Sequence, residues 1–350
     1  MTKTYSANDR HSINSADRAA FAMLNTATKF LAKDRDRSAW VIITLGILVL
    51  PLVVGDGYYL NVLNFIAIYF MVAVGLCLLV GYCGQLSISH AAFFAIGAYA
   101  SAILSTRYGL PSFLAVIISQ FIAALLAWGV GAVVLRLHGH YLAIATLALS
   151  IIVEVLIKEM TFLTGGLDGL SGIPALSILG FEFDSDFRFH YLIWPLAMLS
   201  FLFALNLVNS RVGRVMVAIR EGAAIASLFG AEVSRIKIRI FILSSVYASL
   251  AGSLYAHYIS FISPAAGSLM FAIDIIMVIA FGGFTLLWGA LLGVTALTYL
   301  NEYLTVFADY KRMAYGATLI VIMLFFPNGL LIGLRDLLRK FLHSISRVEN

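Results

Sequence analysis

The chain has 350 residues, of which 61% are hydrophobic and only 12% charged, and its formal net charge is +5 at pH 7. A soluble globular domain is about 45–50% apolar and about 25% charged, so this composition excludes a water-soluble fold. In lipid every backbone polar group must be satisfied internally, and the apolar runs are far longer than barrel strands of about ten residues. The composition therefore predicts an all-α integral membrane protein.

Residues 1–39 are polar and basic, and no short apolar core follows their basic start. We therefore expect no cleaved signal peptide here. Apolar residues recur at helical spacing between 21 and 31, which is compatible with a short helix on the membrane surface or with a disordered tail. In either case these residues are predicted to form a cytoplasmic N-terminal extension.

Nine apolar runs follow this extension, and they predict the membrane helices. Their ranges are 40–54, 60–82, 89–105, 113–135, 141–158, 191–209, 239–261, 271–300 and 314–334. Basic residues concentrate before residue 40, in 210–240 and after 334, which places these three regions in the cytoplasm. The connection 159–190 holds five acidic residues against one arginine and is expected to face outward.

The run 271–300 is too long for one membrane helix of about 20 residues and contains the pair Gly282-Gly283. Nine single crossings would also leave the two ends of the chain on opposite sides, although both are predicted to be cytoplasmic. We therefore expect two short helices, near 271–282 and 286–300. This raises the prediction to about ten membrane segments, in a membrane domain 40–335 followed by a cytoplasmic tail 336–350.

No catalytic or metal-binding motif is present in the sequence. His138 and His140 flank a glycine and are interpreted as part of a polar turn, and the two cysteines as small hydrophobic residues. Without a phosphate-binding loop the chain cannot hydrolyse ATP itself. The sequence thus predicts a protein that is not an enzyme and binds no metal, cofactor or nucleic acid.

The cytoplasmic segment 210–238 contains an apolar stretch that Gly213 and Gly230 bracket as the predicted start and end of a helix. It is too short to span a membrane. A basic loop that follows the positive-inside rule would explain the arginines, but not the apolar residues between them. We therefore favour a helix that docks into a partner protein.

Two further groups of residues are candidates for a substrate pathway or gate. The outer run TGGLDGLSGIP contains Thr164, Gly165, Gly166, Gly169 and Gly172, which suit either close approach to a ligand or an ordinary loop. Ionisable groups inside predicted helices usually face a polar interior, although each can instead bond to backbone. The second group comprises His90, Asp274, Glu154 and His257, with the pair Gly282 and Gly283 at the break.

Five sequence segments carry a resemblance to a known family. They are GQLSISHAAFFAIGAY at 84–99, HYLAIATLA at 140–148, TGGLDGLSGIP at 164–174, GRVMVAIREGAAIASLFG at 213–230 and SLMFAIDIIMVIAFGG at 268–283. In this order, over roughly 40–335, they resemble the permeases of branched-chain amino-acid ABC importers of the LivM type, a family that also includes urea permeases. The resemblance implies the ABC importer permease fold in a bacterial cytoplasmic membrane.

The resemblance also implies partners and roles. Such a permease pairs with a homologous second permease, two cytoplasmic ABC ATPase subunits and an extracytoplasmic substrate-binding protein, and works by alternating access. The segment 213–230 then corresponds to the ATPase-coupling loop, whose apolar helix would lie in a groove of an ATPase. Its candidate residues are Gly213, Arg214, Ala218, Ile219, Arg220, Glu221, Ala223, Ala224 and Gly230.

The sequence departs from the family pattern in two places. Thr285 and Ala290 replace the small turn residue and the proline that usually follow the glycine pair, and the family does not predict the extension 1–39.

Three alternative functions remain. A urea or other small-metabolite permease of the same family is the main alternative. An ion-driven secondary transporter would need a second broken helix with a carboxylate, and a membrane-embedded enzyme lacks a nucleophile, base and metal.

Overall fold

The computed structural model describes residues 38–52, 57–178 and 180–304, together with Tyr310, Met313, Gly316, Ala317 and Ile320. The chain divides into two compact units, Met1–Leu50 and Pro51–Asn350. The described part of the first unit belongs to the apolar helix Ser38–Leu52. The expected extension before residue 38, the tail 336–350 and most of the span 314–334 lie outside the described residues.

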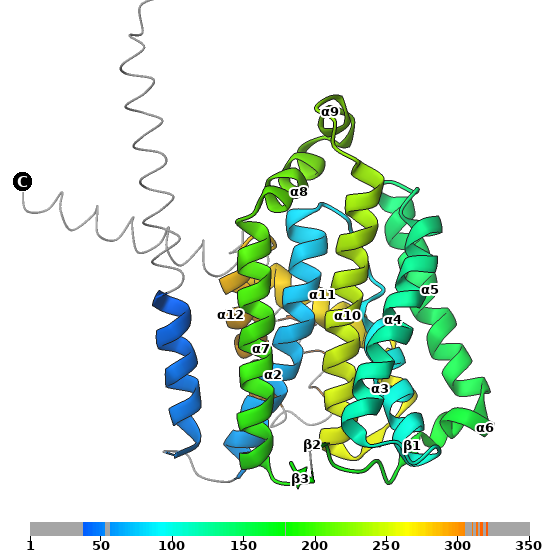
Figure 1. The fold of residues 1–350 in the computed structure, drawn as a ribbon, viewed down its shortest axis with the longest axis vertical. Helices are drawn as coiled ribbons and strands as arrows, with labels where there is room; N and C mark the ends of the chain where they lie inside the picture. The colour runs from blue at the N-terminus through cyan, green and yellow to red at the C-terminus, as the bar shows by residue number, and fades with distance from the viewer. Residues whose placement is uncertain are drawn as a thin grey trace, which may run out of the picture. The chain divides into compact units, whose positions relative to one another are not determined.

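In the second unit the long helices occupy the predicted apolar runs (Figure 1). They are α2 (Tyr58–Leu76), which continues in the π-helical turn η1 (Cys77–Tyr82), α3 (His90–Thr106), α4 (Ser112–Val134), α5 (His140–Glu159), α7 (Asp186–Val208), α10 (Val233–Ile259), α11 (Leu269–Gly282) and α12 (Leu287–Tyr303). Within the described residues, five short helices connect them: α6 (Thr161–Thr164), η2 (Gly166–Asp168), α8 (Arg211–Glu221), α9 (Ala223–Leu228) and η3 (Pro264–Gly267).

The described strands form two small antiparallel pairs at the end of the bundle opposite α8 and α9 (Figure 1). Strand β1 (Leu170–Ser171) pairs with β4 (Phe261–Ile262), with Leu170 opposite Ile262. Strand β2 (Ser177–Ile178) pairs with β3 (Phe181–Glu182). The first pair ties the connection after α5 to the end of α10.

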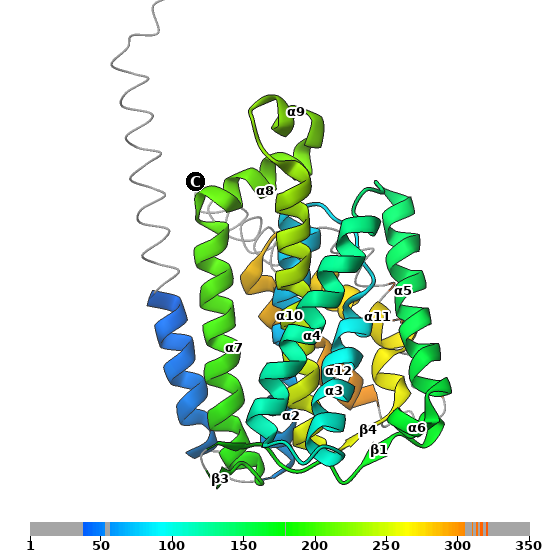
Figure 2. The ribbon, with the colours of Figure 1, turned by 45° about the vertical axis from the view of Figure 1, so that its right-hand side comes forward.

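The core of this unit lies where α10 crosses α2, α3 and α4 (Figure 2). Glycines allow α3 and α10 to approach each other at two points. A Cβ atom on Gly97 would lie 2.1 Å from the carbonyl oxygen of Ser249, and one on Gly252 would lie 2.0 Å from that of Phe94. Small residues at such crossings are typical of membrane helices, whose association depends on close packing.

The predicted break of the 271–300 run is present at Gly283. Helices α11 and α12 meet there at a bend of 120°. Across the bend a Cβ atom on Gly282 would lie 1.9 Å from the carbonyl oxygen of Gly289, and one on Gly293 would lie 2.1 Å from that of Val278. The two helices therefore pack as a tight hairpin, although Thr285 and Ala290 depart from the family pattern.

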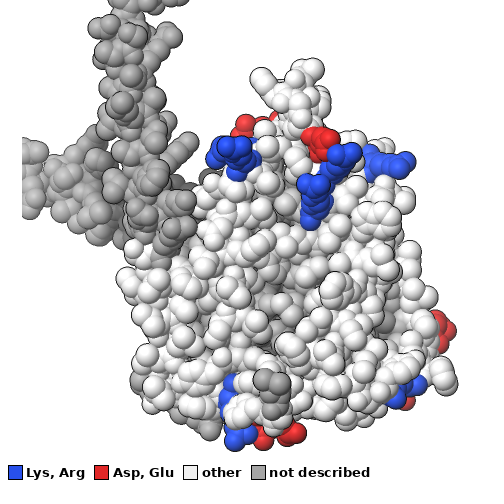
Figure 3. Space-filling model, viewed as in Figure 1, with Lys and Arg blue, Asp and Glu red and all other residues white. Residues whose placement is uncertain are grey.

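The described residues have the properties of a multi-pass membrane protein. Five of their helices are long and apolar enough to cross a bilayer, or six if the bent pair counts as one span, and two shorter apolar helices accompany them. On the face that Figure 3 shows, charged side chains gather at the end that carries α8 and α9 and at the opposite end, with an uncharged belt between them. The predicted total of ten segments stays a prediction.

Candidate functional site

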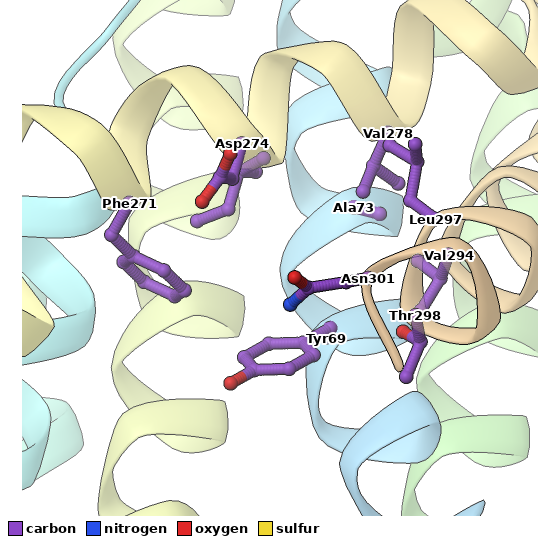
Figure 4. A pocket seen from close by; sticks show the side chains of 10 residues that line it. Tyr69, Ala73, Phe271, Asp274, Val278, Val294, Leu297, Thr298 and Asn301 are labelled. Atoms are coloured by element: carbon purple, nitrogen blue, oxygen red, sulfur yellow. The ribbon is translucent and has the colours of Figure 1, made fainter. Parts of the chain in front are cut away.

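A cavity of about 130 Å³ lies between α2, α11 and α12 (Figure 4). Its polar lining consists of Tyr69, Asp274, Thr298 and Asn301. Its apolar lining consists of Ala73, Phe271, Ile275, Val278, Val294 and Leu297. A concave site with a largely apolar wall and a few convergent polar groups is the usual form of a small-molecule binding site.

The cavity lies at membrane depth. Tyr69 is halfway along the 25-residue apolar span Tyr58–Tyr82. Asp274 is the one charged residue of α11, whose sequence is LMFAIDIIMVIAFG, and its side chain is exposed on this chain. Ionisable residues at such depth usually face a water-filled cavity or another protein chain. Among the described residues, Asp274 is the one charged residue that lines this cavity.

A second cavity, of about 190 Å³, adjoins the first on the side of β4 and η3. Tyr69 and Phe271 line both cavities. Their ring centroids are 5.8 Å apart and the rings are tilted by 56°. The two cavities thus follow one another from the strand end of the bundle toward its centre, with one aromatic pair as their shared wall.

The other predicted pathway side chains lie away from this cavity. His90 is buried, and its Nε2 lies 2.5 Å from the Ser244 hydroxyl, which donates to the Gly75 carbonyl oxygen at 2.6 Å. His257 donates through Nδ1 to the carbonyl oxygen of Pro174 at 2.8 Å. These histidines connect elements of the bundle, whereas Glu154 pairs with Lys158 on the same helix at 2.6 Å.

The glycine-rich run 164–174 forms a compact turn that holds β1 against β4. The hydroxyl of Thr164 donates to the carbonyl oxygen of Ile157 at 2.6 Å. Gly169 has a φ angle of 74°, and a Cβ atom there would lie 2.3 Å from the carbonyl oxygen of Ile262. Only glycine tolerates both conditions. Because Ile262 lines the second cavity, this run positions one wall of that cavity.

The three other predicted glycines of the run have different surroundings. A Cβ atom on Gly165 would lie 2.0 Å from the carbonyl oxygen of Gly169, so these residues pack within the turn. Gly172 has a φ angle of 72° and open space where a side chain would lie. A Cβ atom on Gly166 would meet the methyl group of Thr161 at 2.7 Å. Backbone geometry and close packing thus account for the glycines of this turn.

The segment 210–238 differs from the expected single helix between Gly213 and Gly230. Helix α8 begins at Arg211, because the Ser210 hydroxyl caps it by accepting from the backbone N–H groups of Val212 and Gly213. The helix ends at Glu221, since Gly222 is extended, with a φ angle of −179°, and starts the separate helix α9. The predicted start was therefore wrong, whereas Gly230, with a φ angle of 78°, does end the second helix.

Helix α8 is anchored to the end of α2 through Arg220. Its Nη1 donates to the carbonyl oxygen of Gly81, in the π-helical turn, at 2.7 Å. The same turn reaches the α11–α12 hairpin, because the Cys77 thiol donates to the carbonyl oxygen of Phe284 at 3.1 Å. A Cβ atom on Gly81 would lie 1.8 Å from that oxygen. The π-helical turn therefore contacts both α8 and the hairpin break.

Helix α9 forms a protruding tip beyond α8 (Figures 1 and 2). Ile225, Leu228 and Phe229 are 60%, 85% and 87% exposed there. Ala226 is buried beneath them. Three large apolar side chains at a polar end of the molecule, outside the uncharged belt, are typical of a protein-binding surface.

Of the cavity residues, the sequence pointed to Asp274 alone. Thr298 and Asn301 lie three residues apart on one face of α12. Tyr69 lies far from them along the chain, on α2, so no local spacing connects it to the other two. Elsewhere His138 and His140 are exposed at the start of α5. Across the described part of the chain, no group of three or more His, Cys, Asp or Glu residues is placed to hold a metal ion.

Comparisons with known proteins identify the family. Residues 58–323 match the family model "Branched-chain amino acid transport system / permease component". The high-affinity branched-chain amino acid transport system permease protein LivM of Escherichia coli K12 is 31% identical over 75% of this chain and 68% of its own length. LivM of Salmonella typhimurium LT2 is 30% identical over the same shares.

More distant relatives and solved structures complete the comparison. The permease protein LivH of Salmonella typhimurium LT2 is 24% identical over 75% of this chain and 91% of its own length. The ribose import permease protein RbsC of Haemophilus influenzae is 25% identical over 77% of this chain and 85% of its own. No solved structure matches the chain. The chain is a transport subunit and belongs to the family of branched-chain amino acid transport system permease components.

Proposed function

We propose that this chain is a permease subunit of an ATP-driven ABC importer for branched-chain amino acids in a bacterial cytoplasmic membrane. It forms half of the translocation pathway, beside a homologous second permease. Two cytoplasmic ATPases supply the free energy and an extracytoplasmic binding protein delivers the substrate. The names of the LivM and LivH relatives support this substrate class.

The observation that carries the proposal is the exposed apolar tip formed by α9. Leu228 and Phe229 are more than four-fifths exposed, and they follow helix α8, which carries Arg211, Arg214 and Arg220. Burying two such side chains in a groove of an ATPase would contribute about 3–6 kcal/mol. This tip gives the chain a mechanical contact for a partner that hydrolyses ATP.

The proposal also assigns an orientation and a pathway. The tip and both chain ends face the cytoplasm in an arrangement of about ten segments, consistent with the positive-inside rule. The strand end then faces the binding protein. The cavity of about 190 Å³ beside β4 and η3 is the outer entrance, and the cavity of about 130 Å³ beside Asp274 is the deeper part of the pathway.

The test is reconstitution in proteoliposomes with the partner permease, ATPases and binding protein. We expect leucine uptake that requires ATP and is not inhibited by urea. ATP hydrolysis without leucine uptake would contradict the substrate class. Leucine uptake by this chain alone under an ion gradient would contradict the importer class.

A further inference from the structure

We propose that the cavity between α2, α11 and α12 is a subsite that recognises the primary ammonium group of a zwitterionic amino acid, with Asp274 as its counter-ion. The inference rests on the proposed function and names the chemical group that the pathway selects. It concerns recognition within the permease itself. It is therefore separate from the affinity of the binding protein that delivers the substrate.

The carboxylate of Asp274 lies in an otherwise apolar helix at membrane depth. Asp274 is the one charged residue in α11, and its side chain is exposed although the helix is otherwise apolar. An exposed carboxylate that faced lipid tails at this depth would be costly, so such groups face water or an ionic partner. The cavity that Asp274 lines offers that polar space. A transported cation that enters the cavity meets this carboxylate.

Polar side chains of two other helices line the same cavity as the Asp274 carboxylate. Figure 4 shows the Asn301 amide on α12 and the Tyr69 ring on α2 directed into the space that Asp274 borders. An asparagine amide donates two hydrogen bonds, so Asn301 suits the carboxylate of a zwitterion. Asp274 accepts hydrogen bonds from the ammonium group. The two charged ends of one small molecule thus have separate partners on α11 and α12.

The rest of the cavity wall is apolar, and the cavity is small. The cavity of about 130 Å³ is close to the roughly 150 Å³ of an apolar protein cavity that holds benzene. Val278, Val294 and Leu297 line it, and all three are buried. A branched aliphatic side chain of four carbon atoms suits that volume and that surface. A small polar molecule such as urea would leave the apolar wall without a partner.

Tyr69 and Phe271 place this subsite behind an aromatic wall. Their rings separate it from the cavity beside β4 and η3. A substrate that arrives from that side must displace one ring before it reaches Asp274. The subsite is therefore the second of two successive compartments, and a displaced ring can return behind the substrate.

The test measures occupancy of the cavity without relying on transport. The substitution Thr298→Cys places a thiol in the lining, whereas both native cysteines are buried. The assembled importer is treated with a maleimide, and the labelling rate is measured with millimolar leucine, 3-methylbutylamine or 4-methylpentanoate. We expect leucine and the amine to slow labelling at least threefold. The deaminated acid should leave the rate unchanged, since it lacks the ammonium group.

The carboxylate is then varied in the Thr298→Cys background. Asp274→Asn should abolish protection by leucine, and Asp274→Glu should retain at least part of it. Asp184→Asn, which removes a carboxylate at the strand end of the bundle, is the matched control and should leave protection intact. The unprotected labelling rate reports whether each variant keeps its fold. In proteoliposomes, Asp274→Asn should lower leucine uptake about tenfold, the loss expected when a charged hydrogen bond is removed.

Besides the absence of protection by leucine, two results would overturn the subsite. One is equal protection by 4-methylpentanoate and leucine, because the ammonium group would then play no part. The other is loss of the partner permease from purified Asp274→Asn, which would place the carboxylate in a subunit contact. The proposed function is judged separately, by leucine uptake in the unaltered importer. Uptake without protection therefore overturns the subsite alone, and protection without uptake overturns the proposed function alone.

Discussion

The α9 tip and the α11–α12 hairpin use apolar residues and glycines in opposite ways. At the tip, Leu228 and Phe229 are exposed, and Gly222 and Gly230 interrupt the backbone so that a short helix protrudes. At the hairpin, Gly282 and Gly289 remove side chains so that two helices touch along their backbones. The tip is therefore an exposed apolar surface, whereas the hairpin is a close-packed scaffold beside a cavity.

The two regions are connected through the π-helical turn at the end of α2. Arg220 of α8 binds the carbonyl oxygen of Gly81, and Cys77 in the same turn binds that of Phe284 at the hairpin break. π-Helical turns are rare and often lie at functional sites. A displacement of α8 can therefore reach the hairpin through two hydrogen bonds, without a change in the central packing of α3 and α10.

The largest effect is expected for Gly81→Ala, which breaks the connection at its centre. The added Cβ atom would lie 1.8 Å from the Phe284 carbonyl oxygen, so backbone must move. We expect a loss of stability of about 1–3 kcal/mol or more, measured as a lower melting temperature of the purified protein. Gly129→Ala on α4, with open space around it, is the control. Equal melting temperatures for the two variants would disprove the close contact.

The second-largest effect is expected when the apolar side chains of the tip are replaced by charged ones. Leu228→Asp combined with Phe229→Asp should weaken ATPase binding more than tenfold, because the binding free energy from burying two apolar side chains is lost. Co-purification of the ATPases and ATP-driven uptake are the measurements. Leu228→Met with Phe229→Leu keeps the tip apolar and should retain both. Normal ATPase binding by the aspartate variant would show that the tip is not the docking surface.

A smaller effect is expected when only the bond between the two regions is changed. Arg220→Lys keeps the charge but loses the planar guanidinium that reaches Gly81. We expect the ATPases to bind normally, while the leucine taken up per ATP hydrolysed falls about three- to tenfold. Arg214→Lys on the same helix is the control. An unchanged transport ratio in the Arg220 variant would mean that this bond does not transmit motion.

The smallest effect is expected at the strand end. Asp184 and Arg188 form an ion pair at 2.8 Å with half-exposed side chains. Exposed pairs of this kind contribute only about 0.2–1 kcal/mol. Asp184→Asn should therefore change the melting temperature by at most a few degrees. A large destabilisation would show that this end depends on electrostatics more than its exposure suggests.

The sequence predicted the positions of the long helices well, because lipid requires continuous apolar runs. It missed helix ends that carry polar residues. Helix α7 begins at Asp186 instead of 191, with Ser185 as its cap, and α10 begins at Val233 instead of 239. An apolar run ends where charged residues begin, but the backbone hydrogen bonds of the helix continue through those charged residues. The glycine pair did predict a break in the run 271–300, and the structure has a bend of 120° there.

The candidate site was only partly predictable. Asp274 was identifiable as a charge within an apolar run. Tyr69 and Asn301 line the same cavity only because α2 packs against the hairpin. No local sequence pattern predicts that packing. For the run 164–174 the glycines left two interpretations open, close approach to a ligand and an ordinary loop. There the close approach to Ile262 accounts for Gly169 without a ligand.

The most direct test measures whether ATP binding by ATPases docked at the tip changes the accessibility of the cavity. The maleimide labelling rate of Thr298→Cys is measured in the assembled importer without nucleotide and with ATP trapped in the ATPases. We predict that the rate changes at least threefold between the two states, and that the aspartate variant of Leu228 and Phe229 abolishes the change. If the labelling rate is the same with and without trapped ATP in the importer that keeps Leu228 and Phe229, the tip and the cavity are not coupled.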